Sequence, residues 1–281
     1  MQLSGVHTAL ITPFCDGAVD LDTYSALCAR QIDAGVAGLV PCGTTGETPT
    51  LDQEEWSQLI STAVRAADGK VPVTAGCGTN STASTVANIG RAKALGADAA
   101  LVVFPYYNKP NPAGLRAHVE ACCRVGLPIV LYHVPGRTGQ RLDAGMLVEL
   151  CHTPGVVAIK EATGDVELGQ RLVNLGVPVL SGDDFTFPAL TAVGGAGVIS
   201  VVSNLAPSMT VALAKAAQDG DRDTLLRINA RLQPVVDFLF SDSNPVPCKA
   251  AMSELGLCKN ELRLPLAPGV TPPPALIEGL Q

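Results

Sequence analysis

Eight short apolar segments that alternate with amphipathic segments of helical periodicity predict an α/β fold, a (β/α)8 TIM barrel, for this 281-residue chain. Strands that are apolar almost throughout are typical of parallel strands covered by helices. An open, doubly wound sheet is the alternative. Such a sheet carries a GxGxxG fingerprint after its first strand, and this chain has Thr12-Pro13-Phe14 there instead. We therefore expect the strands to close into a barrel.

Glycine and proline breaks set the order of the elements along the chain. Strands are predicted at residues 8–12, 38–41, 71–75, 99–104, 128–132, 156–159, 178–180 and 197–199. Helices are predicted between them, for example at 20–34, 52–67, 81–95 and 112–125. Asp52 and Ser81 occupy N-cap positions before two of these helices.

The pattern changes after Ile199, where three helical segments at 207–218, 221–240 and 246–255 precede a proline-rich tail. The barrel needs only one more helix. We expect residues 1–206 to form the barrel, closed by the following helix, and residues 207–281 to form a C-terminal helical appendage packed on it.

Composition narrows the class of protein. The formal net charge of −7 argues against a basic binding surface, so we expect neither nucleic acid nor a membrane as a partner. Hydrophobic residues make up 47% of the chain, which is enough for a sizeable core. Nine cysteines without a CxxC pair predict reduced thiols in a cytoplasmic protein, and the four histidines show no metal-ligand spacing. We expect no metal, no signal peptide and no membrane span.

Lys160 is the residue around which the functional hypothesis is built. It directly follows the apolar segment 156–159, and strand ends of this kind carry the active site in barrels. Burial disfavours the ammonium form and lowers the pKa of an amine, which can then act as a nucleophile near neutral pH. The alternative is that Lys160 pairs with Glu161 or extends to solvent.

Polar motifs follow other predicted strands. Gly43-Thr44-Thr45-Gly46-Glu47 follows the second, Pro105-Tyr106-Tyr107-Asn108 the fourth, and Tyr132-His133-Val134-Pro135-Gly136-Arg137 the fifth. Phenols and hydroxyls can relay protons, while backbone N–H groups and a guanidinium can bind carboxylates. Each motif alone has a plainer explanation as a tight turn, an aromatic pair or a surface arginine. Together with the lysine they indicate carbonyl chemistry through a Schiff base.

On these motifs, with Ile159-Lys160-Glu161-Ala162-Thr163-Gly164 and Ser181-Gly182-Asp183-Asp184, the chain resembles the dihydrodipicolinate synthase family over nearly its whole length. This family belongs to the pyruvate-dependent class I aldolase, or N-acetylneuraminate lyase, superfamily. The resemblance implies a lyase that condenses pyruvate with L-aspartate 4-semialdehyde to 4-hydroxy-tetrahydrodipicolinate. It therefore implies a role in lysine and diaminopimelate biosynthesis, with no cofactor beyond the lysine imine.

The resemblance also implies residue roles. Lys160 forms the imine with pyruvate, Tyr132 is the general acid and base, and Thr44 continues the proton relay. Tyr107 completes the relay from a neighbouring subunit, which implies a homodimer or homotetramer. The implied substrate-binding residues are Thr45 for the pyruvate carboxylate, Arg137 for the semialdehyde carboxylate, and Gly182 and Ile199 for the pyruvate pocket.

Arg137 separates the hypotheses within the superfamily. Another pyruvate-type class I aldolase or dehydratase, acting on a keto-acid sugar, is the alternative, but such relatives typically lack an arginine in this loop. A non-catalytic barrel that binds keto acids is the third hypothesis. His133 and Phe104 stand where the family usually has Asn and Thr, and we expect them to tune the pocket.

The resemblance also bears on feedback inhibition by lysine. Sensitive members use a histidine or tryptophan, a second histidine and a glutamate to hold the effector. This chain has Gln53, Trp56 and Ser84 at the matching positions, and keeps Asn80 and Tyr106. Because position 84 lacks a carboxylate, the effector's ammonium group loses its ion partner, and we predict weak or absent inhibition.

Overall fold

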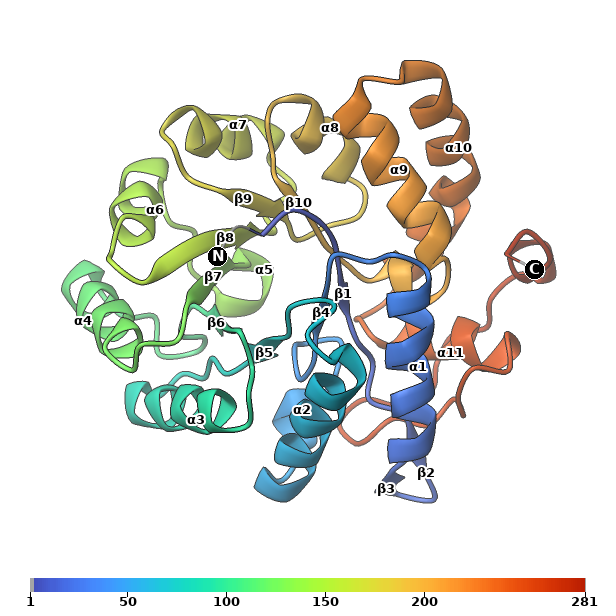
Figure 1. Ribbon diagram of the computed structural model, residues 1–281, viewed down its shortest axis with the longest axis horizontal. Coiled ribbons are helices and arrows are strands. Elements are labelled where there is room, and N and C mark those ends of the chain that lie inside the picture. The colour runs from blue at the N-terminus through green and yellow to red at the C-terminus, as the bar shows by residue number, and fades with distance from the viewer. Residues whose placement is uncertain (1–2, 281) are drawn as a thin grey trace.

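The computed structural model describes residues 3–280, and its centre is a parallel barrel (Figure 1). The sheet runs in the order β4-β1-β10-β9-β8-β7-β6-β5. A parallel bridge between Leu39 and Val73 links its two outer strands and closes the barrel. Within the described residues the eight strands are β1 Gly5–Ala9, β4 Gly38–Val40, β5 Thr74–Gly76, β6 Ala99–Val103, β7 Ile129–His133, β8 Val156–Glu161, β9 Val179–Ser181 and β10 Gly197–Ser200. The predicted fold class is confirmed.

Helices surround the barrel and follow its strands one by one (Figure 1). They are α1 Leu21–Asp33, α2 Gln53–Ala67, α3 Thr82–Ala94, α4 Pro112–Cys123, α6 Ala144–Cys151, α7 Val166–Asn174, α8 Phe187–Ala192 and α9 Pro207–Asp219. Asp52 caps α2, accepting hydrogen bonds from the Glu54 and Glu55 N–H groups while the Glu55 carboxylate accepts one from the Asp52 N–H. Ser81 caps α3 through the Ser84 N–H. Both predicted N-caps are therefore confirmed.

Two apolar layers result from the alternation of side chains along each strand. Ala158 and Tyr132 belong to a cluster inside the barrel, together with Ile199 from β10. Leu131 and Ile159, their neighbours in sequence, belong to the larger cluster between the strands and the helices. Because Lys160 lies two residues beyond Ala158, this alternation directs its side chain to the barrel interior.

The C-terminal part continues from α9 into α10 Arg222–Leu239, α11 Val246–Glu254 and the short α12 Pro274–Glu278. α10 packs on α9, and α11 packs on α10 and on η2 Val202–Asn204. In the stretch between α11 and α12, Lys259 pairs with Asp16, which lies shortly after β1 in the sequence. In the part of the chain that the structure describes, we find no helix long and apolar enough to cross a bilayer.

Three details differ from the predictions. The first strand begins and ends earlier than 8–12, because Gly5 to Thr8 pair with β10 and Thr12 turns away to bond Gly46. A small hairpin, β2 Phe14–Cys15 with β3 Ala18–Val19, follows it. Strand β8 continues through Lys160 and Glu161, which pair with Tyr132 and His133 of β7. Lys160 therefore lies within the strand rather than after it.

Candidate active site

Lys160 is buried inside the barrel, with 6% of its surface exposed. The register of β7 and β8 sets it beside Tyr132, and its Nζ lies 4.3 Å from the centroid of the tyrosine ring. No carboxylate among residues 3–280 forms an ion pair with it. The alternative that Lys160 pairs with Glu161 is therefore wrong, and the amine faces an aromatic ring.

Glu161 points to the opposite side of the strand from Lys160. Its Oε1 lies 3.4 Å from His133 Nδ1 and accepts a hydrogen bond from the Thr163 N–H at 3.0 Å. The Leu142 N–H donates to His133 Nε2, so the proton of the neutral imidazole is on Nδ1, facing the carboxylate. Phe104 packs edge-on against the same imidazole. His133 and Phe104 therefore belong to the layer outside the barrel, next to the lysine strand.

The turn at residues 43–47 joins β4 to η1 Thr48–Thr50. Its own backbone closes it, because the Gly46 N–H donates to Gly43 O and the Glu47 N–H donates to Thr44 O. Thr12 adds a hydrogen bond to Gly46 O at 2.7 Å. The N–H groups of Thr44 and Thr45 form no hydrogen bond with the residues that are described. These two donors are thus available to a carboxylate ligand.

A pocket of about 400 Å³ opens beside this turn at the carboxyl ends of the strands. Among its lining residues are six that the sequence analysis singled out, namely Thr44, Gln53, Trp56, Tyr106, Tyr132 and Arg137. Lys160 is not among the lining residues, but its Nζ lies against the ring of Tyr132, which is one of them. Tyr132 and Thr44, the two residues predicted to relay protons, thus line one pocket, with the amine beside the phenol ring.

Arg137 and Thr45 approach each other through Asn244. Arg137 lies in α5 Pro135–Thr138, is exposed, and donates to the Asn244 backbone carbonyl at 3.5 Å. The Asn244 side chain donates to Thr45 Oγ1 at 2.8 Å. Sequence reasoning missed Asn244, because nothing in a loop asparagine indicates a partner 199 residues away.

The other predicted site residues lie outside the pocket lining. Tyr107 is 88% exposed, with a φ of 72°, so its phenol extends away from this chain. Ile199 is buried in the barrel interior. Gly182 donates to Glu161 O at 2.6 Å, and a Cβ there would lie 2.4 Å from Ala162 Cβ, so only glycine fits.

Two adjacent carboxyl groups follow strand β9. Burial raises the pKa of Asp183 to about 6, while the positive charge of Lys160 opposes this shift. Burial also raises the pKa of Asp184, whose carboxylate accepts hydrogen bonds from Ser200 Oγ and from two N–H groups at the start of η2. Asp184 thus acts as an anchor for the chain after β10.

The residues expected at an effector cleft are differently engaged. Trp56 is buried and donates its indole N–H to Gly76 O at 3.1 Å. The Gln53 Oε1 accepts from Arg91, and the Asn80 carbonyl accepts from Asn108. Ser84 is exposed in the first turn of α3. The Trp56 indole and the Gln53 side-chain carbonyl are thus already hydrogen-bonded, Asn80 is engaged through its backbone, and Ser84 is short and uncharged.

A second buried lysine, Lys249, was missed by sequence reasoning. It pairs with Glu47, the last residue of the 43–47 turn, at 2.5 Å, and both side chains are almost completely buried. A signal was present, because Lys249 interrupts the apolar face of the predicted helix 246–255. Its partner could not be predicted, since it lies 202 residues earlier in the chain.

The donor set of the site suits organic rather than metal chemistry. Among the described residues no group of three or more His, Cys, Asp or Glu side chains could hold a metal ion. An imine-forming enzyme requires an amine that no neighbouring carboxylate holds in the protonated form. The fold and the site together define a lysine-dependent, Schiff-base-forming barrel enzyme.

Comparisons with known proteins agree with this class. Residues 2–271 match the sequence profile of the Dihydrodipicolinate synthetase family. The 4-hydroxy-tetrahydrodipicolinate synthase of Pelobacter propionicus is 45% identical over 272 residues, covering 95% of this chain and 93% of the relative. A crystal structure of dihydrodipicolinate synthase from Thermotoga maritima is similar at a TM-score of 0.94 and 40% identity, covering 100% of this chain and 97% of that one. A chloride-inhibited dihydrodipicolinate synthase from Acinetobacter baumannii, complexed with pyruvate, gives a TM-score of 0.93 and 40% identity, covering 99% and 96%.

The chain therefore belongs to the dihydrodipicolinate synthetase family, as the motifs predicted, and it is an enzyme of the lyase class.

Proposed function

We propose that this chain condenses pyruvate with L-aspartate 4-semialdehyde to 4-hydroxy-tetrahydrodipicolinate, a step of lysine and diaminopimelate biosynthesis. Family membership and the names of the relatives support this reaction. The related Acinetobacter baumannii enzyme complexed with pyruvate supports the first substrate. The observation that carries the proposal is the buried Lys160 amine beside Tyr132, without a carboxylate partner among residues 3–280.

The chemistry follows from this arrangement. The Lys160 amine attacks the pyruvate ketone, and the carbinolamine loses water to give an imine. Loss of a methyl proton gives an enamine, whose carbon forms the new bond to the aldehyde of the semialdehyde. The amino group of the product chain then displaces Lys160 as the ring closes. Tyr132 and Thr44 move the protons of these steps, and no metal or other cofactor takes part.

The hydrogen-bond donors of the site indicate where the carboxylate group of each substrate binds. Thr45 and the open N–H groups of the 43–47 turn bind the pyruvate carboxylate, and Arg137 binds that of the semialdehyde. Gly182 and Ile199 shape the pyruvate side of the barrel interior. A polyol substrate would not need the guanidinium, so Arg137 favours the semialdehyde over a keto-acid sugar, and none of the compared relatives supports the sugar reaction.

The working unit is a homodimer or homotetramer in which Tyr107 of one subunit completes the proton relay of another. Its 88% exposure and left-handed backbone support this role, because an aromatic side chain is rarely left in water without a partner. We assign residues 1–206 to the barrel, which the following helix α9 closes, and residues 207–281 to the C-terminal helical part packed on it. Nine free thiols support a reducing, cytoplasmic setting.

Borohydride reduction in the presence of pyruvate tests the proposal. The wild-type chain should gain the mass of one reduced pyruvate adduct on Lys160. Lys160→Ala should gain none, and the exposed Lys215→Ala should react like the wild type. A wild-type chain that traps pyruvate but fails to condense it with the semialdehyde would refute the proposed reaction. Such a result would support only the class of Schiff-base-forming enzymes.

Inhibition by lysine is predicted to be weak or absent. Position 84 lacks a carboxylate, and the Trp56 N–H is already bonded to Gly76 O. Saturating lysine should therefore leave the condensation rate within about twofold of the uninhibited rate, since lost ion pairs of this kind weaken binding by 10-fold or more. A collapse of activity in the same assay would contradict the prediction.

A further inference from the structure

The 43–47 turn is strained at both of its flanks. Cys42 has a φ of 54° and Glu47 a φ of 53°, a left-handed conformation that is unfavourable for residues other than glycine. Such conformations persist only where the surrounding structure fixes them. Because Thr44 and Thr45 lie between these two residues, whatever fixes Glu47 also fixes the proposed relay and carboxylate-binding groups.

Glu47 is held from the C-terminal part of the chain. Its Oε1 pairs with Lys249 Nζ at 2.5 Å, and its Oε2 accepts a hydrogen bond from the Arg263 backbone N–H at 3.0 Å. The exposed fractions of the Lys249 and Glu47 side chains are 0% and 1%. Both carboxylate oxygens are therefore occupied, and Glu47 cannot move without exposing a buried charge.

Lys249 is itself held on three sides. Besides Glu47, it donates to the Glu261 backbone carbonyl at 2.6 Å and lies 4.1 Å from the centroid of the Phe14 ring. A pair of apolar residues with the same volume would stabilise the fold at least as well as a buried ion pair. The charges are thus better explained by the position they impose on Glu47 than by stability.

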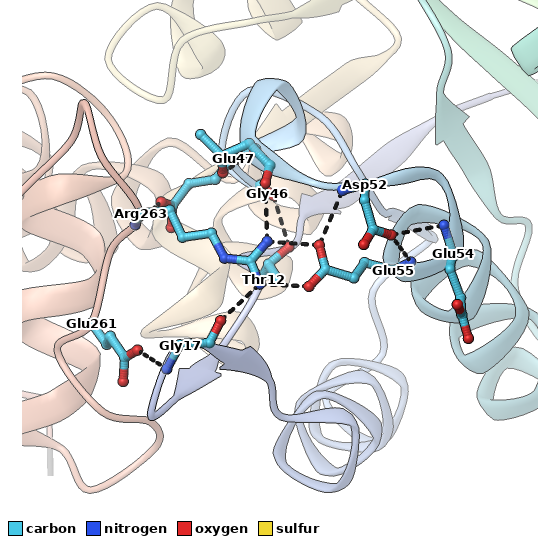
Figure 2. A network of polar contacts seen from close by, with 10 residues as sticks. Thr12, Gly17, Gly46, Glu47, Asp52, Glu54, Glu55, Glu261 and Arg263 are labelled. Carbon is cyan, nitrogen blue, oxygen red and sulfur yellow. Dashed lines mark hydrogen bonds and ion pairs between the residues drawn. The ribbon is translucent and has the colours of Figure 1, made fainter.

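Arg263 fixes the other side of the turn (Figure 2). Its guanidinium donates to Thr50 O at 2.9 Å and to Gly17 O at 2.9 Å, and it binds the Glu55 carboxylate through two nitrogens. Glu55 also closes the capping box of α2. Figure 2 shows the guanidinium between the β2–β3 hairpin and the start of α2, so one residue ties both to the C-terminal segment.

Asn244 adds a direct contact to the turn, since its Nδ2 donates to Thr45 Oγ1 at 2.8 Å. The contacts from Asn244, Lys249 and Arg263 all converge on the 43–47 turn and on the elements that follow it.

We propose that Lys249 is a positioning residue for catalysis, which holds the 43–47 turn in its strained, active geometry through the Glu47 carboxylate. The Arg263 guanidinium supports this geometry from the other side, because it fixes Thr50 and Glu55, which follow the turn. The C-terminal segment 244–263 is therefore part of the catalytic apparatus and not only a covering of the barrel. This inference rests on the function proposed above, because it uses the roles given there to Thr44 and Thr45.

The test compares Lys249→Met, the double variant Glu47→Gln/Lys249→Met, and the control Lys215→Met on the surface of α9. Folded Lys249→Met should lose about 100-fold in kcat/KM for pyruvate, since small misplacements of positioning groups cost this much. The KM for the semialdehyde should change by less than about threefold, because Arg137 stays in place. The control should match the wild type.

The double variant separates position from stability. It removes both charges, so its melting temperature should recover towards the wild-type value, while its kcat/KM for pyruvate should stay at least about 10-fold low. Wild-type kinetics in folded Lys249→Met, or a double variant that regains both stability and activity, would overturn the proposal. If Lys249→Met does not fold, the kinetics of the double variant decide. If neither folds, Arg263→Ala decides, with an expected loss of about 10-fold and with wild-type kinetics as the contrary result.

The rate of pyruvate trapping by borohydride keeps the two proposals apart. A wild-type chain without condensation activity would defeat the proposed function alone, provided that pyruvate still traps on Lys160. In that case a slower trapping rate in the folded Lys249→Met variant, or in the double variant, would still support the positioning role, and an unchanged rate would refute it.

Discussion

Lys160 and Lys249 are both buried, yet their surroundings differ in the one respect that decides reactivity. Lys249 is held as an ammonium by the Glu47 carboxylate and the Glu261 carbonyl. Burial lowers its pKa, and the Glu47 charge opposes this shift. Lys160 faces the Tyr132 ring and has no carboxylate partner among residues 3–280. Burial alone does not produce a nucleophile. A carboxylate beside a buried amine stabilises its protonated form, in which the nitrogen has no free lone pair for attack.

Exchanging Lys160 for methionine is expected to have the largest effect. Turnover should fall by at least about 10⁴-fold, since the covalent step is lost. Stability should stay equal or increase, because Lys160→Met removes a buried polar group that has no ion partner within residues 3–280. Steady-state kinetics and thermal unfolding measure the two effects. A variant that keeps turnover within about 10-fold of the wild type would show that the amine is not the nucleophile.

In contrast to Lys160→Met, the exchange of Lys249 for methionine should lower the stability of the fold. Removing one partner leaves Glu47 as an uncompensated buried charge, which costs about 3–5 kcal/mol of unfolding free energy. Urea unfolding measures the loss, and adding Glu47→Gln should recover most of it. An unchanged midpoint in the single variant would mean that water reaches Glu47 and that the two lysines are less different than described.

Tyr132→Phe should lower kcat by about 100-fold or more, because it removes the proposed acid and base but keeps the ring beside Lys160. Folding stability should hardly change. Tyr24→Phe is the matched control, since the Tyr24 hydroxyl is buried in the outer layer and has no partner within the described chain. Equal activities of the two phenylalanine variants would refute the role of Tyr132.

The last expected effect concerns Asp183 and the pH dependence of stability. Its folded pKa is about 6, above its usual range, so between about pH 4 and pH 6 the folded state holds a proton that the unfolded state has released. Stability due to this group therefore falls as pH rises through that window. Asp183→Asn should lack this decline and gain about 3 kcal/mol relative to wild type between pH 4 and pH 7, since each unit of pKa shift corresponds to about 1.4 kcal/mol; unfolding at several pH values measures the gain. A constant difference across this range would contradict the shift.

The barrel was predictable because each strand and helix carries its own local pattern. The predicted helix 81–95, for example, begins at its N-cap Ser81 and ends at its C-cap Leu95. Lys160 was predictable for the same reason, since a charge that ends an apolar strand is visible in the sequence. The extent of β8 was not, because pairing with β7 continues through polar residues.

Contacts between distant residues set the limit of the prediction. Lys249 is visible as a charge on an apolar helix, but its partner Glu47 appears in the sequence only as the last residue of a turn motif. The sequence contains no periodicity that relates two residues 202 positions apart. The His133–Glu161 pair was missed for a different reason, because Glu161 was considered as a partner of its neighbour Lys160 rather than of the adjacent strand.

The Glu47–Lys249 pair also has a consequence for biosynthesis. A ribosome makes the chain from its N-terminus, so the 43–47 turn and every strand of the barrel emerge before Lys249 and Arg263 do. A nascent chain can thus assemble its barrel while the turn still lacks its anchor. Premature termination after the last strand but before residue 249 would therefore release a chain that has every barrel strand and lacks the anchor of the 43–47 turn.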